Sequence, residues 1–480
     1  MADTGKPCVA IAGASGFIGK ALCAELSRHM SVIALSRRAP PPPQPHAPCQ
    51  WRQADLFSLL QVEQAVSGAT CGIYLVHSMQ PTSRMTQGSF EDIDLILADN
   101  FARAARKQGL KRIIYLGGII PQHAATKAHL SPHLRSRLEV ERVLSSYGTE
   151  VIAIRAGLVV GRGGSSFKIL ESLVRRLPLM LCPRWTQTLG QPIALSDVVT
   201  ILTRTLQDPE LPAGAYDIGG ADVLSYIDMM RLVAKKLGLW RAFVGTRLFT
   251  PTLSRLWVSL ITGASKELIY PLIESLKHEM IVQGDVLFRR YGFAAKSFSA
   301  ALDEALTTTK ERLPPVQPQA AGRVVVAVNS VCSIQRVRIP HGRSVAWTSQ
   351  TYSRWLPRFL APLIRVDVDA QGSMRFYLQP LGLQWKSVLG LELSFSRERS
   401  SETRSLYYIT GGVLSDNRDG KPPGRFEFRQ VPGHNEVVIA ILNYLPRLPW
   451  WFYVWTQAQV HIFVMNCFGR VTRRLAEREA

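Results

Sequence analysis

Three glycines spaced three residues apart follow the first apolar run of the chain. The turn reads Gly13-Ala14-Ser15-Gly16-Phe17-Ile18-Gly19 and comes directly after Val9-Ala10-Ile11-Ala12. Gly13 permits a tight turn, Gly16 lets the backbone approach a ligand, and Gly19 lets a helix pack closely against a strand. The helix N-terminus offers free N–H groups and a partial positive charge to phosphates. The spacing therefore predicts a dinucleotide site that uses Gly13, Ser15, Gly16, Phe17, Ile18 and Gly19.

The end of the second apolar run indicates which dinucleotide is bound. An Asp or Glu at this place would accept hydrogen bonds from a ribose 2′-hydroxyl, but the residues are Ser36-Arg37-Arg38. A hydroxyl and two guanidinium groups suit a 2′-phosphate instead. We therefore expect NADP(H) rather than NAD(H). The alternative is that Arg37 and Arg38 are ordinary surface charges.

Two further pairs of residues fall at the ends of apolar runs. Asp55 and Leu56 follow the third run, where a contact with the adenine would fall. Val76 and His77 end the fourth run and are expected to face the crevice that holds the cofactor ribose. His77 is then placed to touch substrate or cofactor, and a plain structural histidine is the alternative.

The elements that must position these residues alternate along the first half of the chain. Helical stretches such as 17–29 and 90–108 lie between apolar runs at 8–12, 31–36, 72–77, 112–116 and 151–155. This alternation predicts an α/β fold with a doubly wound parallel sheet. The apolar residues 246–281, which Pro251 and Pro271 interrupt, are expected either to cap a substrate cleft or to form simple core helices.

The pattern changes after the proline-rich stretch Leu313–Gly322. Alternating runs then follow at 324–338, 364–369, 374–379, 388–396, 404–413, 425–430 and 436–443. With a helix near 343–360 and a long one from Trp450 to about Ala476, they predict an α+β domain with an antiparallel sheet. We expect a Rossmann domain at 1–312 with a substrate segment at about 160–300, a linker at 313–323, and a second domain at 324–480.

The C-terminal helix is apolar on most faces, so it needs a wrapping partner. It carries Trp450, Trp451, Trp455, Phe463 and Phe468, with Gln457 and His461 one turn apart. One interpretation is core packing against the sheet. Another is a tunnel for an apolar ligand, with Gln457 and His461 as interior polar contacts. The tryptophans and the flanking arginines (Arg447, Arg470, Arg473 and Arg474) also suit a peripheral contact with a membrane surface.

Composition limits the classes of partner. The net charge of +21 favours anionic partners, but no nucleic-acid-binding module is visible, so we expect no nucleic acid partner. The seven cysteines have no metal-ligand spacing and read as thiols in a reducing compartment. We see no signal peptide and no uncharged run of the roughly 18 residues that a spanning helix needs. The expected location is the cytoplasm, or the inner face of the membrane as a peripheral protein, and the sequence leaves the oligomeric state open.

Residues 1–300 resemble the short-chain dehydrogenase/reductase superfamily, in its extended and atypical branches. Beyond the glycine turn, the resemblance is carried by Asp55-Leu56, Tyr74-Leu75-Val76-His77-Ser78-Met79, Ile113-Ile114-Tyr115-Leu116-Gly117-Gly118, Ile154-Arg155-Ala156-Gly157, Ile193-Ala194-Leu195-Ser196-Asp197-Val198 and Tyr216-Asp217-Ile218-Gly219-Gly220. It implies an NAD(P)-binding Rossmann domain with oxidoreductase activity.

The C-terminal part is similar to the uncharacterised domain DUF2867. The similarity is carried by Gly424-Arg425-Phe426-Glu427-Phe428, Arg447-Leu448-Pro449-Trp450-Trp451 and Gln457-Ala458-Gln459-Val460-His461. That domain is commonly fused behind an atypical reductase. Its order of strands and a long helix resembles the helix-grip fold, which encloses apolar ligands, although a fold alone does not fix a function.

The resemblance also shows which catalytic residues are replaced. Reductases of this superfamily use a Tyr that exchanges a proton with the substrate oxygen, and a Lys four residues later that holds the nicotinamide ribose. In the matching stretch Ser131–Glu141, His133 takes the Tyr position and Arg137 the Lys position. The Ser that helps to bind the substrate oxygen falls at Gly117 or Gly118.

Three interpretations of this replacement are open. His133 is the proton donor and Arg137 holds the ribose, which is chemically sensible because histidine titrates near neutral pH. Alternatively, the proton comes from water or from the second domain. In the third interpretation the cofactor is bound but not turned over.

The leading function is therefore an NADP(H)-dependent oxidoreductase that reduces a bulky apolar carbonyl or a quinone-like substrate. The competing function is a non-catalytic NADP(H)-binding regulator or complex subunit, whose C-terminal domain binds a lipid or another hydrophobic ligand.

Overall fold

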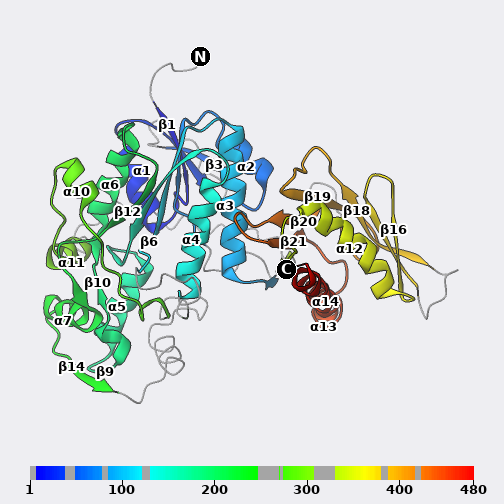
Figure 1. Ribbon diagram of the computed structural model, residues 1–480. Coiled ribbons are helices and arrows are strands. Elements are labelled where there is room, and N and C mark those ends of the chain that lie inside the picture. Colours follow the sequence, from blue (N-terminus) through cyan, green and yellow to red (C-terminus); the bar gives the residue numbers. More distant parts are fainter. Residues whose placement is uncertain are drawn as a thin grey trace. The chain divides into compact units, whose positions relative to one another are not determined.

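The structure is a computed structural model of the chain (Figure 1). It describes residues 7–37, 49–77, 85–121, 130–246, 270, 274–307, 330–379, 387–416 and 423–479. Contacts divide the chain into two compact units. The first unit is Met1–Gln80 with Asp94–Gly322, and the second unit is Pro81–Ile93 with Arg323–Ala480.

The first unit is built on a sheet of seven parallel strands in the order β12-β7-β6-β4-β1-β2-β3. The strands are β1 (Cys8–Ala12), β2 (Ser31–Ser36), β3 (Gln50–Gln53), β4 (Cys71–Tyr74), β6 (Arg112–Gly118), β7 (Glu150–Ala156) and β12 (Gly214–Ile218). The central strands are almost continuously apolar and buried, as strands covered on both faces must be. The predicted doubly wound parallel sheet is confirmed.

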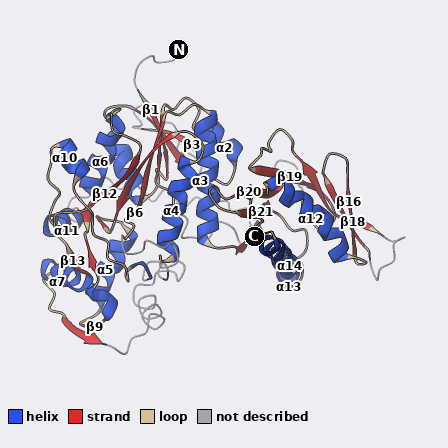
Figure 2. Ribbon diagram, viewed as in Figure 1, coloured by secondary structure: helices blue, strands red, loops and turns tan. Residues whose placement is uncertain are grey.

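Helices cover both faces of this sheet (Figure 2). They are α1 (Phe17–Leu26), α2 (Leu59–Ala65), α3 (Phe90–Lys107), α4 (Pro132–Ser145) and α6 (Leu195–Gln207), and α1 packs against α6. The strand order reverses direction between β1 and β4. Ligands of doubly wound sheets bind in the crevice outside the carboxyl ends of the strands at such a reversal. The glycine turn after β1 and the residues after β4 therefore share one edge.

A smaller group of elements follows β7 in the first unit. It comprises β8 (Val159–Val160), α5 (Ser165–Arg176), β9 (Leu179–Pro183), the 3-10 helix η3 (Arg184–Gln187), β10 (Leu189–Gly190), β11 (Ile193–Ala194), β13 (Leu224–Ser225), α7 (Tyr226–Lys236), β14 (Ala242–Thr246), α10 (Val286–Tyr291) and α11 (Phe298–Thr307). Its own core includes Phe167, Met229 and Leu302. Most of the predicted cap at 246–281 lies outside the described residues, so its role stays a prediction.

The second unit holds an eight-stranded sheet in the order β16-β17-β18-β19-β20-β21-β15-β5. The strands are β5 (Met85–Gln87), β15 (Val331–Arg338), β16 (Ile364–Val368), β17 (Met374–Leu378), β18 (Val388–Phe395), β19 (Arg404–Gly411), β20 (Gly424–Gln430) and β21 (Glu436–Tyr444). All neighbours are antiparallel except β15 and β5. Helix α12 (Val345–Leu360) packs on the sheet, where the Tyr352 ring contacts Phe426 and Phe428. The predicted α+β second domain is confirmed.

Strand β5 comes from a part of the chain that the sequence assigned to the first domain. Met85 to Gln87 run parallel to Val331–Ser333 of β15, and the Gln87 amide accepts a hydrogen bond from Ser333 at 2.9 Å. Asp92 forms an ion pair with Arg336 at 2.8 Å. The observed division of the chain thus differs from 1–312 and 324–480 at Pro81–Ile93. A strand of three residues carries too little periodicity to be recognised.

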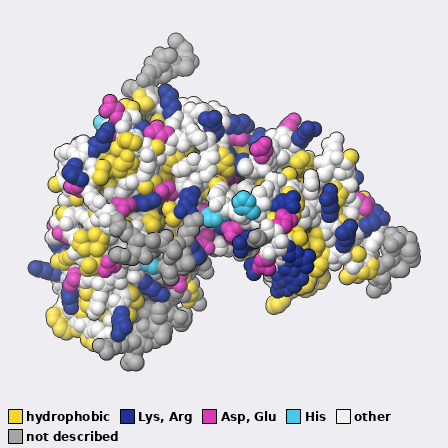
Figure 3. Space-filling view, viewed as in Figure 1, with side chains coloured by type: hydrophobic (Ala, Val, Ile, Leu, Met, Phe, Trp, Pro, Cys, Tyr) yellow, Lys and Arg dark blue, Asp and Glu magenta, His cyan; other side chains and the backbone are white. Residues whose placement is uncertain are grey.

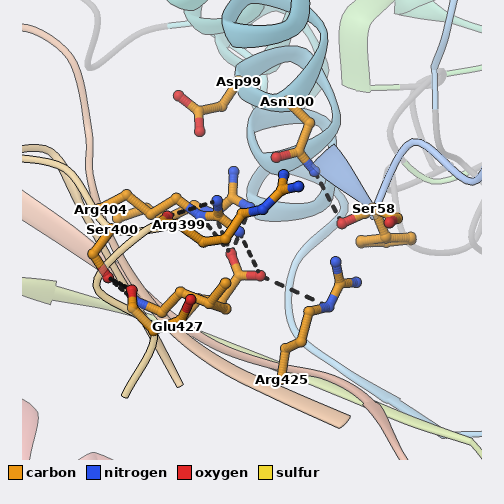
Figure 4. Close-up of polar contacts among 12 residues, drawn as sticks. Ser58, Asp99, Asn100, Arg399, Ser400, Arg404, Arg425 and Glu427 are labelled. Atoms are coloured by element: carbon orange, nitrogen blue, oxygen red, sulfur yellow. Dashed lines mark hydrogen bonds and ion pairs between the residues drawn. The ribbon is translucent and has the colours of Figure 1, made fainter. Parts of the chain in front are cut away.

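One carboxylate and three guanidinium groups are buried in the sheet of the second unit. Glu427 accepts hydrogen bonds from Arg404 at 3.1 Å and Arg429 at 2.7 Å, and Arg425 lies within 3.8 Å (Figure 4). Burial alone would raise the pKa of Glu427, but Arg404, Arg429 and Arg425 together lower it below its ordinary value. The carboxylate therefore stays ionised and compensates this buried positive charge.

The long C-terminal helix that the sequence predicted is two helices, α13 (Trp450–Trp455) and α14 (Gln457–Arg478). The break falls at Thr456, whose hydroxyl donates to the carbonyl of Phe452 at 2.5 Å, a contact that often bends helices. The prediction that this helix packs into the core is confirmed for Phe468, which is fully buried. The same prediction is wrong for Trp451, Trp455 and Phe463, whose side chains are exposed.

Candidate functional site

The glycine turn forms where β1 ends and α1 begins. Gly13 has a φ of +89°, in the left-handed region that favours glycine. A Cβ on Gly13 would lie 3.1 Å from the backbone of Leu75, and one on Gly19 would lie 2.7 Å from the Cα of Ala14. The turn therefore favours glycine at both places, because the backbone just after β4 passes beside Gly13 and the turn itself passes beside Gly19 of α1.

The N-terminus of α1 is open to an anion. Gly16 is the N-cap, no side chain caps the helix, and the first turn holds no acidic residue. Its N–H groups and the helix dipole are therefore available to a phosphate. Phe17 lies instead against Gly161 and Gly164, and Ile18 packs against the core of the sheet. These two side chains therefore pack within the first unit and help to hold the start of α1 in place.

The end of β2 places two of the three residues that were predicted to select NADP(H). Ser36 is the last residue of β2, and Arg37 follows it with an exposed side chain. The amide of Gln53, at the end of β3, donates to the carbonyl of Arg37 at 3.2 Å. Arg38 lies outside the described residues.

The loop after β3 holds Asp55 and Leu56 in fixed positions. The Asp55 carboxylate accepts the N–H of Phe57 at 3.1 Å. Asn100, fully buried in α3, donates its amide to the carbonyls of Leu56 and Phe57, next to Ser58 (Figure 4). The Ser58 hydroxyl caps α2 by accepting from Gln61. Asp55 thus has a structural contact of its own, and its contact with adenine stays a prediction.

Three residues from separate elements form what we call the histidine relay: Asp94 of α3, His77 after β4, and His133 of α4. His77 Nδ1 lies 2.6 Å from the carboxylate of Asp94, and His77 Nε2 lies 3.2 Å from Nδ1 of His133. Ser136, one turn after His133, donates to the same carboxylate at 3.1 Å. The structure therefore brings the predicted His77 and His133 together and adds Asp94 and Ser136.

The geometry assigns the protons in the histidine relay. The Asp94 carboxylate can only accept, so His77 carries its proton on Nδ1 and offers the lone pair of Nε2. His133 then donates from Nδ1, which leaves its Nε2 as the ring atom open to a proton. Burial lowers the pKa of both histidines, with that of His133 well below its ordinary value. Arg137 also lowers the pKa of both, whereas Asp94 raises them. Both rings are therefore neutral at neutral pH.

Arg137 lies one turn after His133 on α4. Its Nη1 is buried and has no hydrogen-bond partner among the described residues. Its carbonyl accepts the hydroxyl of Tyr115 at 3.2 Å. Burial raises the pKa of Tyr115 to about 12, so this phenol stays protonated and its hydroxyl is engaged by the carbonyl of Arg137. A buried, unsatisfied guanidinium N–H suits a phosphate, a carboxylate or a ribose hydroxyl.

Of the two residues that sequence reasoning missed, only Asp94 had a recognisable signal. Asp94 stands alone in the apolar stretch Ile93–Ala98 of an otherwise buried helix and is 1% exposed. A buried acid needs a hydrogen-bonding or charged partner, so its position alone indicated one. Ser136 had no such signal, because a serine on a helix face is common.

The predicted polar contacts of the C-terminal helix fall within α14. Gln457 donates to the hydroxyl of Tyr444 at 2.7 Å. His461 Nε2 is buried without a hydrogen-bond partner in the described part of the chain, and burial lowers the pKa of His461 to about 4. The tunnel for an apolar ligand stays a prediction.

One open cavity of about 620 Å³ lies in the first unit, between Gln191, Gly219–Ala221 and the segment Val282–Ala295. All its lining residues lie in the predicted substrate segment at about 160–300, and none of them is among the predicted cofactor-binding or catalytic residues. Among the described residues, no cluster of His, Cys, Asp and Glu is arranged to hold a metal ion. No described helix is long and apolar enough to cross a membrane.

Comparisons with known proteins agree with this fold. Residues 9–219 match the NAD dependent epimerase/dehydratase family. A segment of 113 residues is 32% identical to the Auxiliary protein GraX of Staphylococcus aureus, covering 24% of this chain and 37% of that protein. An uncharacterised protein of Mycobacterium tuberculosis is 24% identical over 239 residues, which are 48% of this chain and 23% of that protein. The chain thus spans well under half of either relative.

A solved structure shares the fold of the first unit. It is a nucleoside-diphosphate-sugar epimerase from Staphylococcus aureus, with a TM-score of 0.50 and 13% identity. The match covers 62% of this chain and 100% of that one. At this level of identity the similarity concerns the fold alone.

Proposed function

We propose a function from the premise that the N-terminal part of this chain is an NAD(P)-binding Rossmann domain of the atypical short-chain dehydrogenase/reductase kind. On that premise, the protein is an NADP(H)-dependent oxidoreductase that reduces a bulky apolar carbonyl or a quinone-like substrate. The observation that carries the proposal is the histidine relay. It provides a proton-transfer group at the position where the resemblance leads one to expect a tyrosine.

The residues of the crevice fit a dinucleotide. The uncapped N-terminus of α1 and the close approach of Gly13 to Leu75 leave backbone N–H groups for a pyrophosphate. The buried, unsatisfied Nη1 of Arg137 suits an oxygen of the ribose. When bound, NADPH supplies the hydride for the carbonyl carbon. The preference for NADP(H) over NAD(H) rests on Ser36 and Arg37 at the end of β2.

The protein's own residues supply the proton. His133 takes a proton from solvent at Nε2 and donates it from this atom to the substrate oxygen. Its Nδ1 stays hydrogen-bonded to His77, which Asp94 orients. Because the pKa of His133 is low, the imidazolium is scarce at neutral pH but gives up its proton readily. Reduction should therefore accelerate as the pH falls below neutral.

The substrate class rests on the chain's apolar segments. Residues 246–281, which are rich in Leu and Ile, are the segment that was predicted either to cap the substrate cleft or to form core helices. Apolar walls with a few convergent polar groups are typical of small-molecule sites. From this apolar composition we infer a bulky apolar carbonyl compound as the substrate, and menadione is a practical quinone probe.

The test is oxidation of NADPH by menadione with the His133→Gln variant. Glutamine keeps polarity and size but carries no titratable proton, so kcat should fall by about 100-fold or more. His29→Gln is the matched control, because His29 is a half-exposed surface histidine, and its kcat should stay unchanged. Full activity of the His133→Gln variant would show that His133 is not the proton donor.

A second candidate function is favoured by the replacement of the usual tyrosine and lysine by His133 and Arg137. In it, the protein binds NADP(H) without turning it over and acts as a regulator or complex subunit, and the matched relative GraX is named an auxiliary protein. Binding of NADPH without oxidation by any of a broad panel of carbonyls and quinones would favour this candidate over the oxidoreductase.

A further inference from the structure

Helices α13 and α14 of the second unit present large apolar side chains to solvent. Trp451 is 69% exposed, Trp455 is 78% exposed and Phe463 is 60% exposed, and Phe452 and Val460 lie beside them in the sequence. We call these five residues the aromatic face. Apolar side chains this exposed contribute little to a core, although the Phe463 ring contacts Phe359, and a clustered apolar patch usually marks a contact surface.

Arginines border the aromatic face on the same helices. Arg470, Arg473 and Arg474 follow on the exposed side of α14, and Arg447 comes just before α13. We call these four residues the arginine row. No ion pair joins any of them to another residue that the structure describes. In Figure 3, Lys and Arg side chains gather beside hydrophobic ones over α13 and α14.

The spacing along α14 places Phe463 and two of the arginines on the same side of the helix. Phe463 and Arg470 are seven residues apart, which is about 10 Å along a helix. Arg470 and Arg474 lie one turn apart on the same side. Tryptophans favour the boundary between water and lipid, and arginines favour anionic headgroups. Glu477 and Glu479 lie beyond the arginines at the end of α14, and Glu479 is paired with Arg343.

The charges favour a lipid surface over a second copy of this chain. Docking two identical aromatic faces against each other would place two arginine rows at one interface, where the carboxylates of Glu477 and Glu479 at the end of α14 are too few to compensate them. An anionic bilayer instead neutralises the arginines while it buries the rings. The contact is peripheral, since no described helix is apolar enough to cross a membrane.

We propose that the aromatic face and the arginine row together bind the surface of an anionic lipid bilayer. The rings enter the headgroup region, and the arginines pair with lipid phosphates. This inference is independent of the proposed enzymatic function, because it concerns other residues on the second unit.

The experiment is co-sedimentation of the full chain with vesicles. Phosphatidylcholine vesicles with added phosphatidylglycerol should bind the protein, and pure phosphatidylcholine vesicles should bind it far less. The variant with Arg470, Arg473 and Arg474 changed to Gln should bind about 100-fold more weakly, since each cation near an anionic surface contributes roughly fivefold. The variant Trp451→Ser, Trp455→Ser and Phe463→Ser should lose at least about tenfold.

Trp240→Ser is the matched control, because Trp240 is 82% exposed but lies on the first unit. Its binding should equal that of the unchanged protein, and thermal unfolding should show that all variants fold. The proposal is overturned if vesicles with and without phosphatidylglycerol bind equally, or if Trp240→Ser weakens binding as much as the aromatic variant. It is also overturned if light scattering shows a dimer that the aromatic variant dissociates while vesicle binding is absent.

Discussion

Changing Asp94 to Asn tests whether the histidine relay directs proton transfer. The carboxylate accepts from His77 Nδ1 at 2.6 Å and from Ser136 at 3.1 Å, and Asp94 is almost fully buried. Asparagine has nearly the same size, but it carries no charge and its amide nitrogen can donate. His77 is then free to carry its proton on Nε2, which turns the donor and acceptor of the relay around.

The expected loss follows from the hydrogen bond that is weakened. A hydrogen bond to a charged group contributes about 1.5–3 kcal/mol, which corresponds to a fall of about 10- to 150-fold in kcat/KM. The pH dependence should shift as well. Asp94 raises the pKa of His133, so the variant holds the imidazolium only at still lower pH. The acidic range in which reduction is fast should therefore move to lower pH.

The assay is NADPH oxidation with menadione across pH values from about 5 to about 9, combined with NMR titration of the histidine ring protons. Ser136→Ala is the matched control, because it removes a neutral donor to Asp94 and keeps the charge. Its kcat/KM should change by no more than about fivefold. An unchanged pH profile in Asp94→Asn, or a pKa of His133 that rises, would refute the relay.

Three other predictions concern separate parts of the chain. Arg37→Ala should weaken NADPH binding at least about tenfold more than NADH binding, measured by fluorescence titration, with the exposed Arg28→Ala as control; equal weakening would contradict the preference for NADP(H). Glu427→Gln should destabilise the second unit by about 3–5 kcal/mol in urea unfolding, since it leaves three buried guanidinium groups uncompensated. As the control, changing the partly buried Glu392, which pairs with Arg375, to Gln should destabilise the second unit by less than about 1 kcal/mol. Because the folded pKa of His461 is about 4, the unfolded chain takes up its proton first, so stability should fall by about 3 kcal/mol from pH 6.5 to pH 4. His461→Leu should abolish most of this fall, and an unchanged acid dependence would argue against a buried neutral ring.

The local features of the fold were predictable because they depend on neighbouring residues. The glycine turn stands between a continuous apolar run and an amphipathic stretch, and β1 and β2 have the expected bounds Cys8–Ala12 and Ser31–Ser36. The break at Thr456 was not predictable, because the residue is compatible with a helix and only its hydroxyl contact shows the bend.

The histidine relay could be predicted only in part. His77 and His133 were recognised separately, one by its place after a strand and the other by a resemblance. Asp94 is 17 residues from His77 in the sequence, and His133 is 56 residues from it. The three side chains meet because the elements that carry them come together at the carboxyl edge of the sheet. A local sequence pattern cannot show a contact between residues so far apart, which is why Asp94 was missed.

Strand β5 has a consequence for how the chain is made. Its partner β15 is translated much later, since Gln87 and Ser333 are 246 residues apart. At about 5–20 residues per second, a ribosome needs roughly 10–50 seconds to produce the partner. During this time the first unit can fold, while the backbone N–H and C=O groups of Met85–Gln87 remain without their strand partner. A fragment beginning at Arg323 would lack this edge strand. In such a fragment the outer edge of β15 would be left without its partner strand and open to pairing with a second chain.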